Sequence, residues 1–240
     1  MKDIFLTFDM NWAIDEVLED FYQLIKEYQV KATVHVTHQT RYIETFRQDD
    51  AFEIGIHPNF NRGLQGDAGN SVDKTLGDMK AMVPEAVCCR GHALTTSSLI
   101  VALYDKYGIK YDLNHIVEPV PGMKLSSYQA QSGAAQILPF IFEDDVYISR
   151  KNRKPIAFYL GEEFDAPRIF NFHPQHLFLN TVSPEMYDAT RPYYKCYSRL
   201  QELRNTKERG VRDIFADLIR LAKKEGNIFK KISEGDWVHS

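Results

Sequence analysis

The stretch of residues 2–12 constrains the fold more than any other part of the chain. It reads KDIFLTFDMNW, an apolar run rich in β-forming residues that ends abruptly in an acid, an amide and an indole. A short apolar run bounded in this way is typical of a buried strand in a parallel sheet. The carboxyl ends of such strands are where α/β proteins place their chemistry. Strand alternation would put Asp9 and Asn11 on the same side, so we expect both to belong to a site.

A simpler role for Asp9 is to cap the helix that follows, because aspartate is a favoured N-cap residue. Asp15 is better placed for that role, directly before the periodic run of residues 16–28. A second observation also favours a site, since similar polar clusters recur at the ends of later predicted strands. We therefore prefer the interpretation in which Asp9 carries chemistry.

Size and charge narrow the class of protein. A chain of 240 residues fits one α/β domain, so we expect residues 1–240 to form a single domain. The formal net charge of −4 gives no reason to expect nucleic acid or an anionic membrane as a partner. No run of 18 or more apolar residues is present, so we expect no membrane span.

Cysteine usage and the N-terminus indicate the compartment. The chain has three cysteines, Cys88, Cys89 and Cys196, and an odd count with an adjacent pair is not a disulfide framework. We expect them to be small buried residues in a reducing compartment. The N-terminus lacks a basic segment followed by a long apolar stretch, so no signal peptide is expected. The cytoplasm is the predicted location.

Hydrophobic periodicity predicts alternating strands and helices, the pattern that builds a parallel sheet. Two segments, 62–70 and 118–133, lack periodicity and are expected to be irregular, the first as a loop over the site. Ser71 is expected to cap the helix that follows it. The predicted strands are 2–12, 31–36, 52–56, 86–89, 110–113, 135–142 and 166–172, and the clearest predicted helices are 15–28, 72–83, 97–107 and 211–224.

Five of these strands end in polar clusters. A single such ending means little, but five at carboxyl ends indicate a polar pocket at one face of a barrel or open sheet. Carboxylate oxygen and imidazole nitrogen are ligands that suit zinc or a harder divalent ion. The alternative is that the two histidines followed by proline are only turn residues. The clusters are Asp9/Asn11, His57/Asn61, Arg90/His92, Glu143/Asp144/Asp145 and His173/His176.

Two further histidines flank the end of the second predicted strand. His35 lies inside the alternating run and is explained as a core histidine with its hydrogen bonds satisfied. His38 lies past the strand, on the side where sites form, and is the better functional candidate of the two.

These clusters resemble the motifs of the polysaccharide deacetylases, the NodB-homology or carbohydrate esterase group. Thr7-Phe8-Asp9 looks like the opening motif, and Glu53-Ile54-Gly55-Ile56-His57 looks like the second motif with its metal-binding histidine. Arg90 matches the arginine of the third motif. The resemblance is greatest to the WbmS-type branch, over nearly the whole chain. Five segments of the chain resemble the pattern of this branch. They are Asp9-x-Asn11-Trp12-Ala13, His57-Pro58-Asn59-Phe60, Arg90-Gly91-His92, Phe142-Glu143-Asp144-Asp145 and Phe172-His173-Pro174-x-His176-x-Phe178-x-Asn180-Thr181.

The resemblance implies an α/β fold, a distorted and incomplete (β/α)7 barrel that forms one deacetylase-like catalytic domain. It also implies hydrolysis of an acyl group on an amino sugar or sugar precursor in surface polysaccharide (O-antigen) biosynthesis. The substrate would be a carbohydrate or a nucleotide-linked or lipid-linked sugar. In the family a divalent metal activates the attacking water, one aspartate is the base, and a late histidine protonates the leaving amine. For this chain zinc is the expected metal.

Carried over residue by residue, the resemblance assigns Asp9 as base, Arg90 as its orienting partner through a paired hydrogen bond, and His173 as general acid. The metal ligands would be Asp9, Asn11, His57 and Asn61. The remaining members of the motifs are expected to contact the substrate, namely Trp12, Asn59, His92, Glu143, Asp144 and His176.

Two departures from the family pattern bear on the metal. The usual pair of adjacent aspartates is replaced, because Met10 follows Asp9 and the next polar residue is Asn11. The usual second histidine, four residues after His57, is Asn61. Amides are weaker ligands than carboxylate or imidazole, so zinc would be held poorly unless another histidine rebuilds the site. Metal binding is therefore expected to be rebuilt, weak or absent.

The departures leave a second class of function open. The same fold could be a non-catalytic carbohydrate-binding or scaffold protein in a polysaccharide assembly pathway, with Trp12, Phe60 and Tyr128 stacking on sugar rings. A hydrolase of another small amide is a third reading, because fold does not fix substrate.

Overall fold

The computed structural model describes residues 2–130, 133 and 135–237, so residues 131 and 132 of the predicted irregular crossing lie outside the described part. Its centre is one curled sheet with the strand order β6-β7-β5-β4-β3-β2-β1-β9-β8, and β10 pairs with β1 off this path. Every pairing is parallel except that of β6 with β7. The two ends of the order do not pair among the described residues. The predicted distorted, incomplete barrel is therefore confirmed.

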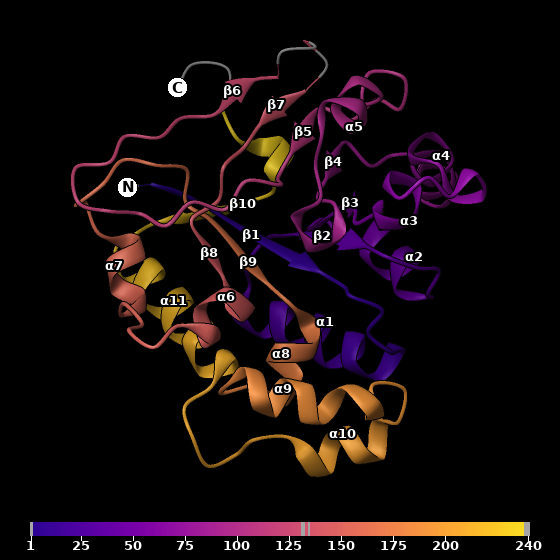
Figure 1. Ribbon diagram of the computed structural model, residues 1–240. Helices are drawn as coiled ribbons and strands as arrows, with labels where there is room; N and C mark the ends of the chain where they lie inside the picture. The colour runs from indigo at the N-terminus through magenta and orange to yellow at the C-terminus, as the bar shows by residue number, and fades with distance from the viewer. Residues whose placement is uncertain (1, 131–132, 134, 238–240) are drawn as a thin grey trace.

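The first strand, β1 (Asp3–Asp9), is the hub of the sheet (Figure 1). It pairs with β2 (Ala32–Val36), β9 (Ile169–Phe172) and β10 (Ile228–Lys230), so the N-terminal and C-terminal parts of the chain meet on it. Six consecutive residues of β1 are buried, as expected for a strand covered on both faces.

The strand is shorter than predicted at its carboxyl end. Asn11 and Trp12 have φ values of +43° and +56°, the left-handed region, which turns the chain away from the sheet. The argument from strand alternation that put Asp9 and Asn11 on one side was therefore wrong, because the strand ends at Asp9. The turn after the strand, and not strand alternation, brings Asn11 to the same part of the structure as Asp9.

The other predicted strands lie close to their expected positions in the sequence, but most of them are shorter than predicted. The strand β3 (Phe52–Ile56) has the predicted bounds. The predicted strand 135–142 divides into two short strands, and residues 138–141 between them form only an isolated bridge through Phe140. The short strands are β4 (Cys88–Cys89), β5 (Tyr111–Asp112), β6 (Tyr128–Gln129), β7 (Gln136–Ile137) and β8 (Phe142–Glu143).

Two of the longest helices have the predicted bounds, α1 (Asp15–Tyr28) and α11 (Val211–Lys224). Ser71 caps α4 (Val72–Met82) by accepting from the backbone of Lys74, as predicted. Asp15 is not a cap, because it is the first helical residue and Ile14 occupies the N-cap position. Asp9 caps nothing either, since α1 begins well past it.

Short helices account for most of the differences from the prediction. The helix predicted at 97–107 is reduced to α5 (Ser98–Ala102), and the segment predicted as a loop contains α3 (Asn61–Leu64) and the 3₁₀ turn η1 (Ala68–Asn70). No bounds were predicted for α2 (Tyr42–Arg47), η2 (His92–Leu94), α6 (Asp144–Ser149), α7 (Ile156–Leu160), α8 (Pro174–Leu179), α9 (Pro184–Thr190), η3 (Arg191–Tyr193), α10 (Tyr197–Leu203) and η4 (Ile232–Glu234).

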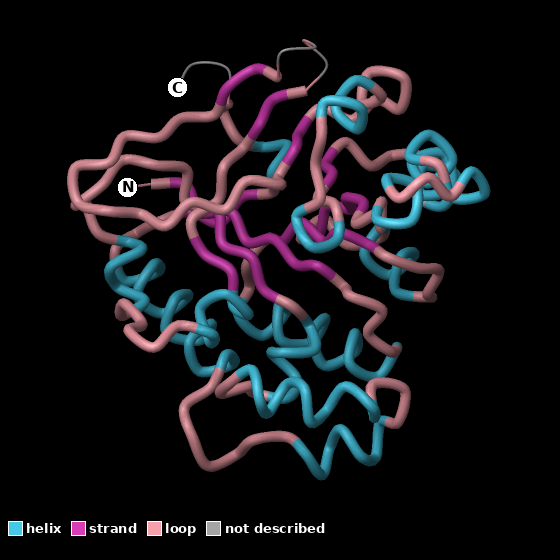
Figure 2. Tube along the Cα trace, in the orientation of Figure 1, coloured by secondary structure: helices cyan, strands magenta, loops and turns pink. Residues whose placement is uncertain are grey.

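Apolar side chains form a core on each face of the sheet. Between the sheet and the helices, Phe8 contacts Phe21 and Phe215 with ring centroids 4.6 and 5.9 Å apart. Inside the curl, Phe5 contacts Trp237 at 4.6 Å. Figure 2 shows helices below and to the right of the strands, while long loops run at the upper left. No helix in the described ranges is long and apolar enough to cross a bilayer.

The cysteines follow the prediction in part. Cys88 and Cys89 are buried and free, but Cys196 is free and exposed on the surface, so the expectation of a buried residue was wrong for it.

Candidate functional site

A cavity of 360 Å³ lies at the carboxyl ends of β1, β3, β8 and β9. Three acid–base groups of its wall are Asp9 at the end of β1, Glu143 at the end of β8 and His173 directly after β9. The chain thus delivers side chains from segments far apart in sequence to one place, as parallel sheets do. The wall consists of Asp9, Asn11, His57, His92, Ala93, Leu94, Glu143, Asp145, Val146, His173, Tyr187 and Arg191.

Asp9 is a buried carboxylate held by three donors. Its Oδ1 accepts from Arg90 and from the Nδ1 atom of His35, each at 3.1 Å, and its Oδ2 accepts from Asn171 at 2.9 Å. Burial opposes ionisation, but the charge of Arg90, together with His57 and His35, holds the pKa of Asp9 well below its ordinary value. Asp9 is therefore charged, fixed in orientation, and has one acceptor position left on Oδ2.

Arg90 is fully buried and holds Asp9 with one hydrogen bond, not with the expected pair. The same terminal nitrogen also donates to Thr7 at 3.0 Å and to Asn171 at 2.5 Å, and Nε donates to the carbonyl of Leu113 at 2.8 Å. The guanidinium lies 4.4 Å from the ring centroid of Phe140. These contacts fix the orientation of the Arg90 guanidinium.

Asn171 donates hydrogen bonds to two carboxyl groups of the site, those of Asp9 and Glu143, and was not predicted as a site residue. Its Nδ2 donates to Asp9 at 2.9 Å and to Glu143 Oε1 at 3.0 Å, while its Oδ1 accepts from Thr7 and Arg90. It is fully buried on β9, so every polar atom of the amide is used inside the protein. An asparagine in the middle of an apolar strand was the available signal, because Asn is depleted in strands.

His173 is oriented by the residue that follows Glu143. The carboxylate of Asp144 accepts from the backbone nitrogen of His173 at 2.8 Å and lies 2.6 Å from its Nδ1. The other ring nitrogen, Nε2, lies 4.0 Å from Asp9 Oδ2 across the cavity. Burial alone would lower the pKa of His173, but Asp144, with Asp145 and Asp9, raises it well above the ordinary value. His173 thus holds a proton at neutral pH and directs it at the cavity.

His57 and His92 form the opposite wall. The Nδ1 atom of His57 lies 3.6 Å from Asp9 Oδ1, and its Nε2 lies 3.3 Å from Nδ1 of His92. Burial lowers the pKa of His57 to about 3, so its ring is neutral near pH 7. The edge of the Trp12 ring lies against His92 with centroids 5.0 Å apart, and Trp12 is 44 % exposed. Trp12 therefore lies at the rim of the site.

Glu143 and Asp145 add two further carboxyl groups to the wall. Burial raises the pKa of Glu143 to about 8, with Asp145 contributing, so Glu143 is mostly protonated at pH 7. Burial also raises the pKa of Asp145. Two carboxyl groups with opposite shifts, Asp9 lowered and Glu143 raised, are the arrangement that separates acid and base roles in hydrolytic sites.

The donor set fits a divalent metal. Asp9, Glu143 and His173 each offer one ligand atom within 4.8 Å of the others, and Asp144, His173 and His176 form a second such group. The Oδ1 atom of Asn11 and Nδ1 of His57 are buried with no hydrogen-bond partner among the described residues. Buried polar atoms of a protein are normally paired, so these two unpaired atoms are consistent with ligands. Oxygen and imidazole donors suit zinc and harder divalent ions.

The other predicted site residues lie outside the cavity wall. Asn59 accepts from the backbone of Asn61, and the Oδ1 atom of Asn61 accepts from Thr95 at 3.2 Å. Asp144 is fully buried behind His173. His176 is buried beside it, with Nδ1 3.0 Å from the hydroxyl of Thr181. Asn61 is thus not among the residues that the structure brings together around Asp9.

Several residues of the site could not be identified from the sequence. His35 is fully buried against Asp9, whereas His38, the predicted better candidate, is half-buried and bonded to its neighbour Thr37. Strand pairing of Asp9 with His35 explains the contact, and register is not visible in the sequence. Tyr187 and Arg191 reach the wall from α9 and η3, two short elements with no periodic signal.

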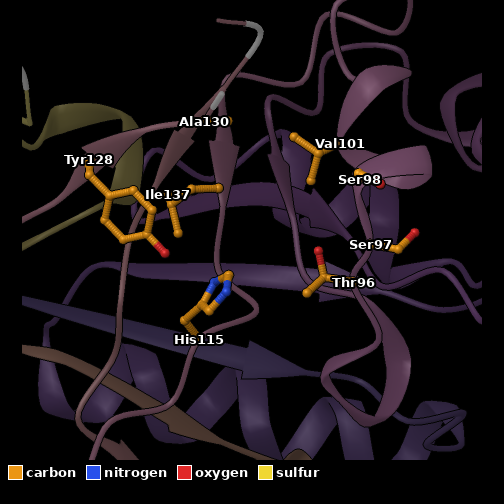
Figure 3. Close-up of a pocket in the computed structure, with 8 residues that line it drawn as sticks. All are labelled: Thr96, Ser97, Ser98, Val101, His115, Tyr128, Ala130 and Ile137. Atoms are coloured by element: carbon orange, nitrogen blue, oxygen red, sulfur yellow. The ribbon is translucent and has the colours of Figure 1, made fainter. Parts of the chain in front are cut away.

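A second pocket lies on the other side of the segment 92–98 and lacks the chemistry of the first. Its volume is 540 Å³, and Figure 3 shows Tyr128 and His115 on one side facing Thr96 and Val101 on the other. Its lining has no carboxylate. The lining is Thr96, Ser97, Ser98, Val101, His115, Tyr128, Ala130 and Ile137.

This placement separates the three aromatic residues considered for sugar stacking. Trp12 lies at the rim of the cavity, and Tyr128 lies in the second pocket. Phe60 is fully buried in the core, so the suggestion that it stacks on a sugar was wrong.

Comparison with known families identifies relatives of the whole chain. Residues 6–191 match the family model of the WbmS-like polysaccharide deacetylases. The chain is also similar to a solved protein from Bordetella bronchiseptica assigned as a polysaccharide deacetylase involved in O-antigen biosynthesis. The two are 31 % identical over 91 % of this chain and 90 % of that chain, with a TM-score of 0.79. A search of the curated proteins gave no match.

More distant solved structures share the fold. A family 4 acetyl xylan esterase from Clostridium thermocellum, solved in complex with a cobalt ion, is 16 % identical, with 97 % of this chain and 89 % of that chain covered and a TM-score of 0.53. A protein from Mycobacterium smegmatis that is assigned as a polysaccharide deacetylase is 13 % identical. The match covers 97 % of this chain and 87 % of that chain, with a TM-score of 0.55.

Proposed function

Because the chain belongs to the WbmS-like family of polysaccharide deacetylases, we propose that it is a metal-assisted hydrolase that removes an acyl group from an amino sugar or sugar precursor of surface polysaccharide synthesis. The observation that carries the proposal is the pairing of Asp9 and His173 across one cavity. Each is held by its own buried partner, Arg90 for the first and Asp144 for the second. A base and an acid fixed next to each other at one cavity can serve the attacking water and the leaving nitrogen of the same amide.

The proposed reaction breaks the amide C–N bond of an N-acylated sugar with one water. Asp9 takes a proton from the attacking water, and His173 gives its Nε2 proton to the nitrogen that leaves as the amine. The acyl group departs as the carboxylic acid. Arg90 and Asn171 keep the Asp9 carboxylate oriented, while Asp144 keeps His173 protonated and aimed at the cavity.

We further propose that a divalent metal, zinc as first choice, is held by Asp9, Asn11 and His57. Such an ion polarises the acyl carbonyl and makes a water nucleophilic near neutral pH. The unpaired atoms of Asn11 and His57 support this assignment. Asn61 is left out of the ligand set because it lies outside the cavity wall and bonds Thr95.

Substrate contacts are proposed for the rim of the cavity. Trp12 and His92 form an aromatic edge against which a sugar ring can pack. The exposed amide of Asn59 lies next to α3 and is retained as a more distant contact, whereas the buried Asp144 and His176 act behind the wall.

Acetate release tests the function. The protein, supplied with zinc, is incubated with N-acetylated monosaccharides and their nucleotide-linked forms, and we expect turnover that Asp9→Asn reduces by at least about 10²-fold. Folding of the variant is checked by thermal unfolding. Absence of acetate release from every sugar and metal would contradict the proposal. If Asp9→Asn then still bound the sugars, the protein would be a carbohydrate-binding module instead.

Metal binding is measured separately from turnover. Calorimetric titration with zinc should show about one equivalent bound, with an affinity that falls by at least about tenfold in His57→Ala. Asn61→Ala is the matched control and should titrate as the unchanged protein does. A loss of affinity in Asn61→Ala but not in His57→Ala would overturn the ligand assignment.

A further inference from the structure

Arg191 gives the cavity wall a feature that the hydrolysis itself does not use. The residue begins η3, which follows α9, and it lies beside Tyr187 on the outer side of the wall. It is the only lysine or arginine among the residues that line the cavity in the described structure. Arg90, the other guanidinium of the site, is fully buried and does not line the cavity.

The guanidinium of Arg191 is available to a ligand. Its side chain is 65 % exposed, and its contact with Asp188 is a single one at 3.3 Å between two exposed groups three residues apart. Exposed pairs of this kind contribute little to stability. Its Cζ lies 5.9 Å from the ring centroid of Tyr187, which limits the directions that the side chain takes. A guanidinium has five N–H donors, so most of them remain free.

The carboxylates inside the cavity do not need Arg191 as a partner. Asp9 is paired with Arg90 at 3.1 Å and Asp144 with His173 at 2.6 Å. Glu143 accepts from Asn171. Within the described part of the chain, no ion pair joins Arg191 to a carboxylate of the wall, Asp145 included. The acidic partner of Arg191 is therefore the exposed Asp188 and not a carboxylate of the cavity wall.

We infer that Arg191 is a specificity residue that binds an anionic oxygen group of the substrate, carried on or next to the acylated sugar. The inference rests on the proposed function and narrows its substrate class. A guanidinium matches a phosphate or a carboxylate in a two-bond, planar contact. A cavity of 360 Å³ is at the small end for ligand sites, so the anion would lie close to the single sugar unit inside.

Two kinds of substrate carry such a group, a sugar linked to phosphate and an amino sugar that is itself a uronic acid. Three probes separate them, N-acetylglucosamine, its 1-phosphate and the corresponding N-acetylated uronic acid. Their binding is measured by calorimetry on the unchanged protein, Arg191→Ala, Arg191→Lys and Arg199→Ala. Arg199 is the matched control, because it also pairs with an acid three residues away, Glu202, and lies over a tyrosine ring, Tyr193, outside the cavity wall.

We expect the unchanged protein and Arg199→Ala to bind one of the two anionic probes at least about tenfold more tightly than the neutral sugar, as a hydrogen bond between charged groups would give. Arg191→Ala should lose this preference while binding the neutral sugar as before, and Arg191→Lys should keep part of it. The anionic probe that is preferred identifies the source of the charge.

Three results would overturn the inference, namely no preference for an anion in the unchanged protein, the same preference in Arg191→Ala, or no binding of any probe. Acetate release by the unchanged protein, followed in parallel, keeps the two proposals apart. Hydrolysis without a charge preference would refute the role of Arg191 alone. A charge preference that disappears in Arg191→Ala, without hydrolysis, would refute the proposed function alone.

Discussion

Asp9 illustrates how a charge can be kept inside a protein. A buried carboxylate is costly unless hydrogen bonds and an opposite charge compensate for the lost water. Here Arg90 supplies the charge, and His35 and Asn171 supply the remaining donors. The same contacts that make the charge tolerable also fix the direction in which Asp9 faces the cavity. Stability and function therefore depend on the same few side chains.

Asn171→Leu tests this dependence, because leucine has nearly the same size and no polar atoms. The change removes a donor from Asp9 and Glu143 and an acceptor from Arg90, all buried. We expect the free energy of unfolding, measured with urea, to fall by about 2 kcal/mol or more. Asn61→Ala, which removes one bond at an exposed residue, should change it by less than about 0.5 kcal/mol. Equal effects of the two changes would contradict the account.

At the scale of elements, the site is built from turns with strained backbones. Asn11 and Trp12 follow β1, and Ala93 and Leu94 lie in η2, all four with positive φ values. Left-handed backbone costs residues other than glycine roughly 1 kcal/mol each, so the surrounding contacts must hold these turns in place. Both turns line or border the cavity, and the contact of Trp12 with His92 connects them.

Ala93→Gly should relieve part of this strain. Glycine adopts a φ of +55° without a steric penalty, so we expect the free energy of unfolding to rise by up to about 1 kcal/mol. Ala216→Gly, in the interior of α11, has no such strain to relieve and should lower it by about 1 kcal/mol. Urea unfolding of both variants is the measurement. A similar loss in both would mean that the turn at Ala93 is not strained.

The elements also show what the sequence could predict and what it could not. The strand β3 and the helices α1 and α11 have the bounds that periodicity predicts, because each has enough residues for its period to appear. Helices of four to seven residues, such as α6 and α9, contain fewer than two turns and give no such signal.

Among the site residues, those at strand ends could be placed because parallel strands end at one edge of a sheet. Asp9, His57, Glu143 and His173 were found in this way. His35 and Asn171 depend on strand register, and Tyr187 and Arg191 depend on how a short helix packs over the cavity. These are tertiary facts that no local pattern contains. The family motif predicted Asn61 as a metal ligand, but in the structure the helix α3 carries it to the surface, outside the cavity wall.

For the whole molecule, the buried histidines predict sensitivity to acid. Burial lowers the pKa of His57 to about 3 and of His176 to about 4, below the ordinary value near 6.5. Between these limits the unfolded chain binds protons that the folded protein does not, so stability falls as the pH falls. Glu143 acts in the opposite direction, because its pKa of about 8 lets the folded protein keep a proton that the unfolded chain loses above about 4.5.

Removing Glu143, one of the groups whose raised pKa opposes this effect, makes the prediction sharper. In a Glu143→Gln background, without added metal, we expect the urea midpoint to decrease steadily from pH 6.5 to pH 4. His176→Gln in the same background should make the decrease shallower, because one of the histidines no longer titrates. A midpoint that is constant or rises on acidification would show that the buried histidines are not held neutral.

The central claim is that Asp9 and His173 act as one hydrolytic unit across the cavity, and a double-mutant comparison of turnover tests it most directly. Acetate release is measured for Asp9→Asn, His173→Gln and the combination, with Arg199→Ala as control. If the two residues serve one reaction, each single change should lower kcat by about 10²-fold or more and the double change hardly further. Effects that multiply, or variants as active as the unchanged protein, would contradict the account.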